Sequence, residues 1–357
     1  MKPAPDLAPG REAVPHAPLL RVRSLQVELP TARGWARAIR DLSLDLDRGQ
    51  TLGLIGESGC GKSLTALALM GLLPGQARVS GSVQLQGQEL LDLPEPAWCR
   101  LRGARMAMVF QEPMTALNPV HTIGRQIAEP LQLHLGLDAA AARARALALL
   151  ERVQLPRARE RLDAYPHELS GGQRQRVMIS IALACGPQLL IADEPTTALD
   201  VTVQKEVLDL IGQLVREDGM GLLLISHDLG LMRDRVDRVM VMYGGARVEQ
   251  AATGDLFARP SHPYTRGLLA ARVRLGLARG QRLQTIAGHV PELVDLPAGC
   301  TFADRCPQAR TVCAQQVPPW QDLPGPTGLA VSGPAMAHAL ACPYSEPAVR
   351  EMQDGQS

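Results

Sequence analysis

Short, near-continuous runs of apolar residues recur along the first two thirds of the chain. Four of them have strand length: 51–56, 105–110, 188–193 and 221–226. Runs without polar alternation are typical of parallel strands that are covered on both faces. Segments of helical pattern lie between them, one from Lys62 to Pro74 and one behind the potential N-cap Asp138. This order predicts an α/β fold with a mainly parallel sheet.

The pattern changes near Pro260, where prolines become frequent and four of the seven cysteines follow. We therefore expect an α/β domain at 20–259 and a smaller appended domain at 260–345. The flanking segments 1–19 and 346–357 are predicted to be disordered tails. A length of 357 residues suits this division, because a domain takes about 150 residues.

Two local patterns bear on the remaining architecture and on the compartment. The pair Gly244-Gly245 between two apolar runs predicts a hairpin. No run approaches 18 apolar residues, so no segment is expected to span a bilayer. The N-terminus lacks the apolar region of a secretory signal, so we expect reduced cysteines rather than structural disulfides.

Composition and charge exclude some classes of partner. The 37 Lys and Arg residues nearly balance the 36 Asp and Glu residues, which leaves a formal net charge of +1. No general basic field therefore attracts nucleic acid or anionic lipid. Aromatic residues make up 3%, which argues against recognition of single strands by stacking. We expect no nucleic-acid partner.

A phosphate-binding motif follows the first predicted strand and opens the first predicted helix. It fits G-x-x-x-x-G-K-[ST] with Gly56, Glu57, Ser58, Gly59, Cys60, Gly61, Lys62 and Ser63. The glycines let successive backbone N–H groups face phosphate oxygens, and the start of the helix adds a favourable dipole. Lys62 supplies a positive charge, and the Ser63 hydroxyl is a ligand for Mg²⁺.

Two carboxylates follow the third predicted strand, 188–193. Asp193 and Glu194 stand where parallel strands deliver residues beside the phosphate loop. Alone, such a pair is more often a helix cap. Together with the phosphate loop, Asp193 is expected to hold Mg²⁺, and Glu194 to take a proton from an attacking water. Because strand side chains alternate, the two carboxylates should point in different directions.

A further motif lies between the phosphate loop and this carboxylate pair. It consists of Leu169, Ser170, Gly171, Gly172 and Gln173. It resembles the signature motif of ATP-binding cassette (ABC) ATPases, which general phosphate-loop enzymes lack. Gln111 resembles the family's Q-loop, residues 197–200 its D-loop and His227 its switch histidine. The resemblance implies an ABC-type ATPase core with a helical subdomain at about 112–182.

The resemblance also implies roles for these residues. Two cassettes would pack head to tail, so that Ser170, Gly171 and Gly172 of one meet ATP bound to the other. Gln173 and Asp200 are further expected ATP contacts. Gln111 would contact Mg²⁺ and the attacking water, and His227 the γ-phosphate. For adenine, Trp35 is the candidate stacking residue, although an exposed loop tryptophan is an equally good interpretation of its position.

The segments VFQEPMTALNP, LSGGQRQRVMIS and HPYTRGLLAA resemble one branch of the family, the dipeptide, oligopeptide and nickel importer ATPases. The likeness covers roughly residues 20–345. It implies a peripheral subunit at the cytoplasmic face of the inner membrane that works with two transmembrane permease subunits, a second ABC ATPase and an external solute-binding protein. His262 to Thr265 (HPYT) carry no evident chemistry and are expected to anchor the appended domain.

The appended domain contains Cys300, Cys306, Cys313 and Cys342. Their spacing differs from that of common zinc ribbons and short ferredoxin runs. Several members of the importer branch carry a [4Fe–4S] cluster in this region, so the resemblance implies a cluster here. Zinc or uncoordinated thiols are the alternatives. Cys99 and Cys185 fall outside the pattern and are expected to be packing residues.

Two other functions remain to be weighed. A soluble DNA-repair or chromosome ATPase also has a signature motif but inserts a long coiled coil before it. Only 106 residues separate Ser63 from Ser170, and no heptad run fills them. An iron–sulfur sensing module with secondary ATPase activity is the third hypothesis. ATP hydrolysis coupled to import of peptides or related solutes agrees best with the motifs.

Overall fold

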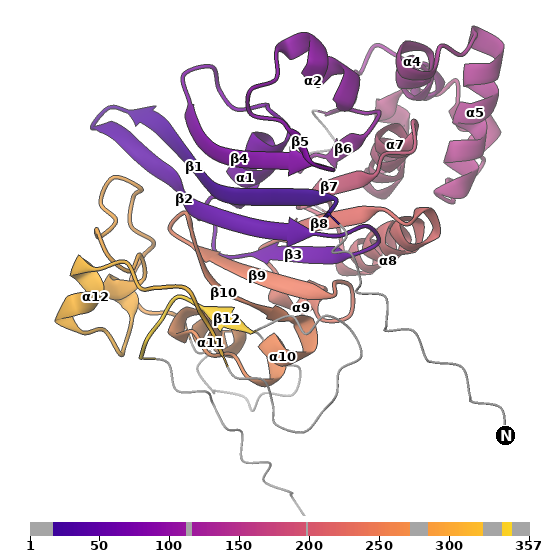
Figure 1. Cartoon of the computed structure of the whole chain (residues 1–357). Coiled ribbons are helices and arrows are strands. Elements are labelled where there is room, and N and C mark those ends of the chain that lie inside the picture. The colour runs from indigo at the N-terminus through magenta and orange to yellow at the C-terminus, as the bar shows by residue number, and fades with distance from the viewer. Residues whose placement is uncertain (1–16, 112–115, 198, 272–284, 324–337, 345–357) are drawn as a thin grey trace, which may run out of the picture.

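The computed structural model describes residues 17–111, 116–197, 199–271, 285–323 and 338–344. Eight strands of these residues form the main sheet: β3 (Thr51–Ile55), β6 (Met106–Val109), β7 (Leu189–Asp193), β8 (Gly221–Ser226), β9 (Arg238–Tyr243), β10 (Ala246–Ala252), β11 (Gln321–Asp322) and β12 (Ala339–Leu340). Their spatial order is β11-β12-β10-β9-β3-β8-β7-β6 (Figure 1). The run from β9 to β6 is parallel throughout. The four predicted strands and the parallel sheet are confirmed.

A second, antiparallel sheet has the order β2-β1-β4-β5. Its strands are β1 (Leu20–Thr31), β2 (Gly34–Leu46), β4 (Arg78–Leu85) and β5 (Gln88–Glu89). This sheet was not expected from the sequence. Its longest pairing, β1 with β2, contains three shifts of register between Val22 and Glu28, so buried positions do not recur at every second residue. Bulges of this kind remove the alternation by which a strand is recognised.

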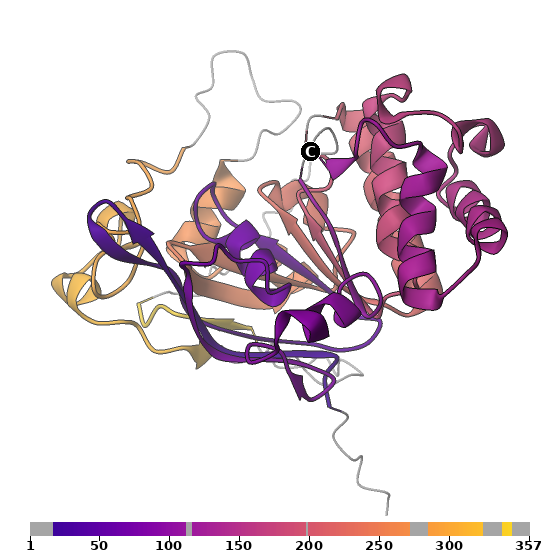
Figure 2. The ribbon, with the colours of Figure 1, turned by 90° about the horizontal axis from the view of Figure 1, so that it is seen from above.

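Helices complete the layers. Those described before residue 120 are α1 (Lys62–Leu69) and α2 (Glu95–Leu101), and those that follow are α4 (Ile123–Leu135), α5 (Ala139–Arg152), α6 (Ala158–Arg161), η1 (Pro166–Glu168), α7 (Gly171–Leu183), α8 (Val201–Asp218), α9 (Leu229–Met232), α10 (Thr253–Ala258), α11 (Pro263–Ala270), η2 (Ala303–Arg305) and α12 (Thr311–Gln315). In both Figure 1 and Figure 2, the group α4, α5 and α7 lies at one end of the molecule and α12 at the other.

Each parallel strand separates two hydrophobic cores. In β7, Leu190 and Ala192 face the core built with α4, α5, α7 and α8. The alternate residues Leu189 and Ile191 face the core built with α1, α2 and the antiparallel sheet. Because both faces are covered, the positions from Leu189 to Ala192 are all apolar, which explains the unbroken runs in the sequence.

Two local expectations had different outcomes. The hairpin is confirmed, because β9 and β10 pair as Tyr243 with Ala246 and the two glycines between them have positive φ. The first helix, expected to continue to Pro74, ends at Leu69. Gly71 takes a left-handed φ of 63°, and the Trp98 ring packs on it at 2.5 Å from the site of a Cβ. Only glycine fits this position, and the chain turns there.

The C-terminal segment shares the main sheet, because β12 pairs with β10 and β11 with β12. The expected domain boundary at 260 and the limits of the helical subdomain remain predictions, and residues 112–115 of that subdomain lie outside the described residues. Nearly all of the two expected tails, 1–19 and 346–357, also lies outside the described residues. Among the helices in the described ranges, none is long and apolar enough to cross a membrane.

Candidate functional site

The phosphate loop connects β3 to α1 and is pressed tightly against neighbouring backbone. A Cβ at Gly56 would lie 2.3 Å from the carbonyl oxygen of Met242. One at Gly61, where φ is 101°, would lie 2.9 Å from the carbonyl oxygen of Ala38. Side chains are therefore excluded at both positions, which lets the loop take the tight curl that an anion-binding loop needs.

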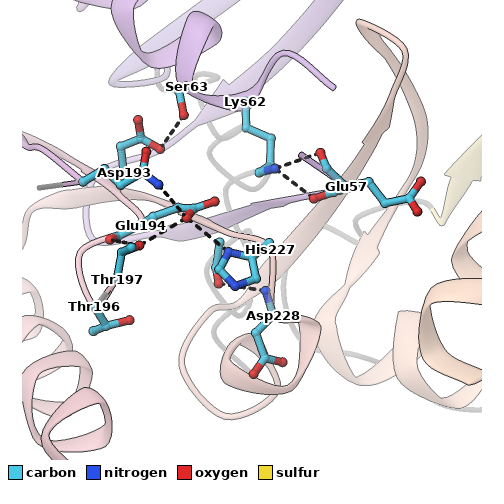
Figure 3. Close-up of polar contacts among 12 residues, drawn as sticks. Glu57, Lys62, Ser63, Asp193, Glu194, Thr196, Thr197, His227 and Asp228 are labelled. Carbon is cyan, nitrogen blue, oxygen red and sulfur yellow. Dashed lines mark hydrogen bonds and ion pairs between the residues drawn. The ribbon is translucent and has the colours of Figure 1, made fainter. Parts of the chain in front are cut away.

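Lys62 brings a positive charge to this loop from the first residue of α1. Its side chain is buried, and its Nζ donates to the carbonyl oxygens of Gly56 at 2.8 Å and Glu57 at 3.1 Å (Figure 3). A cation held beside backbone amides at a helix start is a site for phosphate groups.

Ser63, the residue after Lys62, contacts Asp193 at the end of β7. The Ser63 hydroxyl donates to Oδ1 of Asp193 at 3.0 Å (Figure 3). Burial raises the pKa of Asp193, whereas the Ser63 hydrogen bond and the charge of Lys62 oppose the rise. A hydroxyl and a carboxylate are oxygen ligands that suit Mg²⁺, which in nucleotide sites takes its other ligands from phosphates and water. These two residues therefore fit the expected ion.

Glu194 is the centre of a second polar group. Its Oε2 accepts hydrogen bonds from Gln111 Nε2 at 3.1 Å and Thr197 Oγ1 at 3.2 Å, and lies 3.1 Å from His227 Nδ1 (Figure 3). The side chain of Glu194 is 13% exposed and that of His227 is 64% exposed. One carboxylate oxygen thus has three polar neighbours from three separate segments.

The backbone at Glu194 explains why it points away from Asp193. β7 ends at Asp193, and Glu194 follows with a left-handed φ of 44°. The sequence pattern predicted different directions for Asp193 and Glu194 because side chains alternate along a strand. In the structure the reason is different: the chain turns out of the strand at Glu194. A non-glycine residue in that region is strained by about 1–3 kcal/mol, which is common at functional sites.

Many of these residues line one cavity of about 630 Å³, whereas Asp193 does not. Its lining comprises Leu29, Ala38, Ser58, Gly59, Gly61, Lys62, Ser63, Leu64, Gln111, Glu194, Thr197, His227 and Leu293. Most of the phosphate loop, Gln111, Glu194 and His227 are therefore brought together. Leu293, from the C-terminal segment, was not foreseen, because no motif marks it.

Trp35 lies elsewhere. Its side chain is 44% exposed, and the guanidinium of Arg78 lies 3.7 Å from its ring centroid. Arg78 therefore covers one face of the ring. Trp35 is not among the residues that line the 630 Å³ cavity. Its contact with adenine stays a prediction.

The signature residues form the start of α7. Ser170 is the N-cap, and it and Gln173 form a capping box in which each side chain bonds the other's backbone amide. Ser170 and Gly171 are exposed, and neither lines the cavity of their own chain. The geometry leaves the Ser170 and Gly171 surface open to another molecule.

This surface is backed by the start of α8. A Cβ at Gly172 would lie 2.7 Å from the Val203 side chain, so the two helices approach closely. Asp200 caps α8 by accepting from the amides of Thr202 and Val203. The expected D-loop thus lies against the signature motif, although its residue Ala198 is outside the described residues.

The HPYT motif makes structural contacts, and its expected role in anchoring an appended domain remains a prediction. His262 Nδ1 accepts from the Tyr264 amide and caps α11, and buried Glu249 accepts from the amide of His262. Burial lowers the pKa of His262 to about 4, so the ring stays neutral as an acceptor. A further contact has no local sequence pattern to mark it: the Tyr264 hydroxyl accepts from the Glu57 amide in the phosphate loop at 2.8 Å.

The four tail cysteines gather in one region. Cys300, Cys313 and Cys342 line a cavity of about 90 Å³, and the Cys300 amide donates to the Cys313 carbonyl at 2.7 Å. Burial raises the pKa of Cys300 to about 11, and the other three thiols add to the rise. Across the described residues, no group of three or more His, Cys, Asp or Glu is arranged to hold a metal ion.

The two cysteines expected to pack have different surroundings. Cys185 packs against the core built with α4, α5, α7 and α8, and its Sγ lies 3.4 Å from the Pro130 carbonyl oxygen. Cys99 is exposed on α2, so the prediction that it packs is wrong. It lies on the solvent side of this short helix rather than in a core.

Comparison with known proteins agrees with this geometry. The ABC transporter family profile matches residues 39–197, and the profile of the oligopeptide/dipeptide transporter C-terminal region matches 248–313. The oligopeptide transport ATP-binding protein OppD of Escherichia coli (strain K12) is 47% identical over 86% of this chain and 91% of that protein. A putative peptide import ATP-binding protein of Brucella abortus (strain 2308) is 50% identical over 85% and 91%.

Among solved structures, the dimeric post-hydrolysis state of an ATP-binding cassette bound to ADP and Pi matches with a TM-score of 0.59 and 25% identity. The match covers 66% of this chain and 98% of the other. The sequence matches extend over most of the relatives' length and include the C-terminal region. The chain therefore belongs to the ATP-binding subunits of ABC transporters, in the branch that carries the oligopeptide/dipeptide transporter C-terminal region.

Proposed function

We propose that this chain binds and hydrolyses ATP to power an importer for oligopeptides or dipeptides at the cytoplasmic face of the inner membrane. The observation that carries the ATPase assignment is the cavity on which Lys62, Ser63, Glu194 and His227 converge. Peptide as the solute is supported by the names of relatives that are 47–50% identical, and by the matching C-terminal region.

The residues divide the chemistry of phosphoryl transfer between them. Lys62 and the loop amides bind the phosphates, and Ser63, Asp193 and Gln111 hold Mg²⁺, which when bound neutralises phosphate charge. Glu194 accepts the proton of the attacking water. Gln111, Thr197 and His227 fix its carboxylate, with His227 also directed to the γ-phosphate. His227 is well exposed, so an arriving phosphate meets no covering side chain there.

A second cassette completes each site in this proposal. The exposed Ser170 and Gly171, with Gly172 and Gln173, offer a hydroxyl and helix-start amides to the γ-phosphate of ATP bound to the facing subunit. Asp200, beside them, joins the same interface. That a similar solved cassette is dimeric supports an assembly of two cassettes. The facing subunit is a second ABC ATPase, either a copy of this chain or a related one.

Purification from native membranes tests the assembly. A tagged chain should bring down two multi-spanning permease subunits and a second cassette, which mass spectrometry identifies. An untagged strain serves as the control. We expect the external solute-binding protein to act in the same complex on the other side of the membrane. Recovery of the chain without any membrane protein would argue for the soluble ATPase alternative.

We also propose that Cys300, Cys306, Cys313 and Cys342 hold a [4Fe–4S] cluster. Three of the thiols share one small cavity and the fourth is close enough to raise the pKa of Cys300. Four thiolates crowded together are stabilised by a cationic centre. The structural alternative, zinc, uses the same thiolates.

Metal analysis distinguishes these alternatives. Anaerobically purified protein should contain about four irons per chain and be brown, as expected of a cluster of this type. Cys342→Ser should lose iron, whereas the exposed Cys99→Ser, a matched control, should keep it. Stoichiometric zinc without iron, or no metal at all, would contradict the cluster.

A further inference from the structure

Arg305 reaches from the C-terminal segment into the phosphate loop. Its Nη1 lies 2.6 Å from Oε2 of Glu57 and its Nη2 3.2 Å from Oε1, so the guanidinium bonds both carboxylate oxygens. The Arg305 side chain is 5% exposed and that of Glu57 is 29% exposed. Arg305 also donates to the carbonyl oxygens of Ile286 and Ala287, which fixes its direction. A shielded two-point contact of this kind is stronger than a surface ion pair.

Tyr264 makes a second contact with the same loop residue. Its hydroxyl accepts from the Glu57 amide, and its ring is fully buried. The ring packs against Tyr243 with centroids 4.7 Å apart and against Phe302 at 5.2 Å. Phe302 is also near Arg305 in the sequence. The aromatic cluster of Tyr243, Tyr264 and Phe302 therefore supports both the Tyr264 contact and the Arg305 contact with the phosphate loop.

Glu57 is therefore held at three points. Its carbonyl accepts from Lys62, its amide donates to Tyr264 and its carboxylate is paired with Arg305. Its side chain extends away from Lys62 (Figure 3). A carboxylate in a loop that binds phosphates repels them unless its charge is compensated. Arg305 supplies that compensation and keeps the carboxylate turned away.

We propose that Arg305 and Tyr264 are positioning residues for ATP binding, through which the C-terminal segment holds the phosphate loop in its binding geometry. This inference rests on the proposed ATPase function. By linkage, ATP then stabilises the contact between the C-terminal segment and the core to the same extent that the contact favours ATP.

Equilibrium binding of a fluorescent ATP analogue with Mg²⁺ to the full chain tests this. Arg305→Gln should raise the dissociation constant about 5- to 50-fold, because the Glu57 carboxylate is left uncompensated near the phosphates. Adding Glu57→Gln to Arg305→Gln removes that charge and should restore most of the affinity. Arg305→Lys, which keeps the charge but not the two-point contact, should lie between Arg305→Gln and the wild type.

Arg33→Gln is the matched control. Arg33 pairs with Asp295 of the C-terminal segment, but the pair is exposed and does not touch the phosphate loop, so affinity should stay unchanged. Tyr264→Phe keeps the ring and removes the acceptor, and should weaken binding about 3- to 10-fold. Circular dichroism confirms that each variant is folded.

Two results would overturn the inference: wild-type affinity in both Arg305→Gln and Tyr264→Phe, or a double variant as weak as Arg305→Gln alone. Neither result would contradict the proposed function, because the wild-type chain still binds the nucleotide in both experiments. If the wild type itself bound no nucleotide, the ATPase proposal would fail first.

Discussion

Glu194→Gln removes ATP turnover while leaving ATP binding intact. Glutamine keeps the size of the side chain and still contacts Gln111 and Thr197, but it does not accept a proton from water. We expect steady-state phosphate release to fall about 100-fold or more, the range that loss of a general base produces. The dissociation constant for ATP should change little, because the binding groups of the loop are untouched.

Glu206→Gln is the matched control for this experiment. Glu206 is an exposed residue of α8 that pairs with Arg176 away from the cavity, so turnover should stay at the wild-type level. Full turnover in Glu194→Gln would remove Glu194 from the role of base. A parallel loss of ATP binding would instead show that the substitution damages the site itself.

Lys62→Ala should weaken ATP binding itself, by about 100-fold. The buried Nζ is the cation of the loop, and its removal also takes away the hydrogen bonds that it donates to the carbonyl oxygens of Gly56 and Glu57. The same equilibrium binding assay measures the effect. Because binding fails first, turnover should fall with it at ATP concentrations that saturate the wild type.

Lys205→Ala, in an exposed position on α8, provides the control with the same chemical change. Its ATP affinity should equal that of the wild type. Unchanged affinity in Lys62→Ala would contradict the assignment of the phosphate loop. A fall of similar size in both variants would point to a general loss of fold rather than of a ligand contact.

Features that depend on neighbouring residues were predictable from the sequence. The parallel strands are buried on both faces, so their apolar runs are continuous and easily recognised. The phosphate loop depends on glycines at fixed spacing, and the cap Asp138 begins α5 as expected. In each case the physical requirement and the residues that meet it lie within a few positions of each other.

Features that depend on contacts between distant segments were not predictable. The bulges between Val22 and Glu28 hid the antiparallel sheet, and packing of Trp98 on Gly71 shortened α1. The contact of Arg305 with Glu57 joins residues 248 positions apart, and no local pattern marks either partner. Motifs therefore marked the candidate site residues, whereas the groups that support them became visible only in the fold.

The central claim is that ATP hydrolysis at this site drives peptide import. Uptake of a labelled oligopeptide by cells of the source organism tests it most directly, after deletion of the gene and complementation with either wild type or Glu194→Gln. We predict that wild type restores uptake and that Glu194→Gln, expressed and membrane-bound at the same level, does not. Normal uptake in the deletion strain, or full uptake with Glu194→Gln, would contradict the claim.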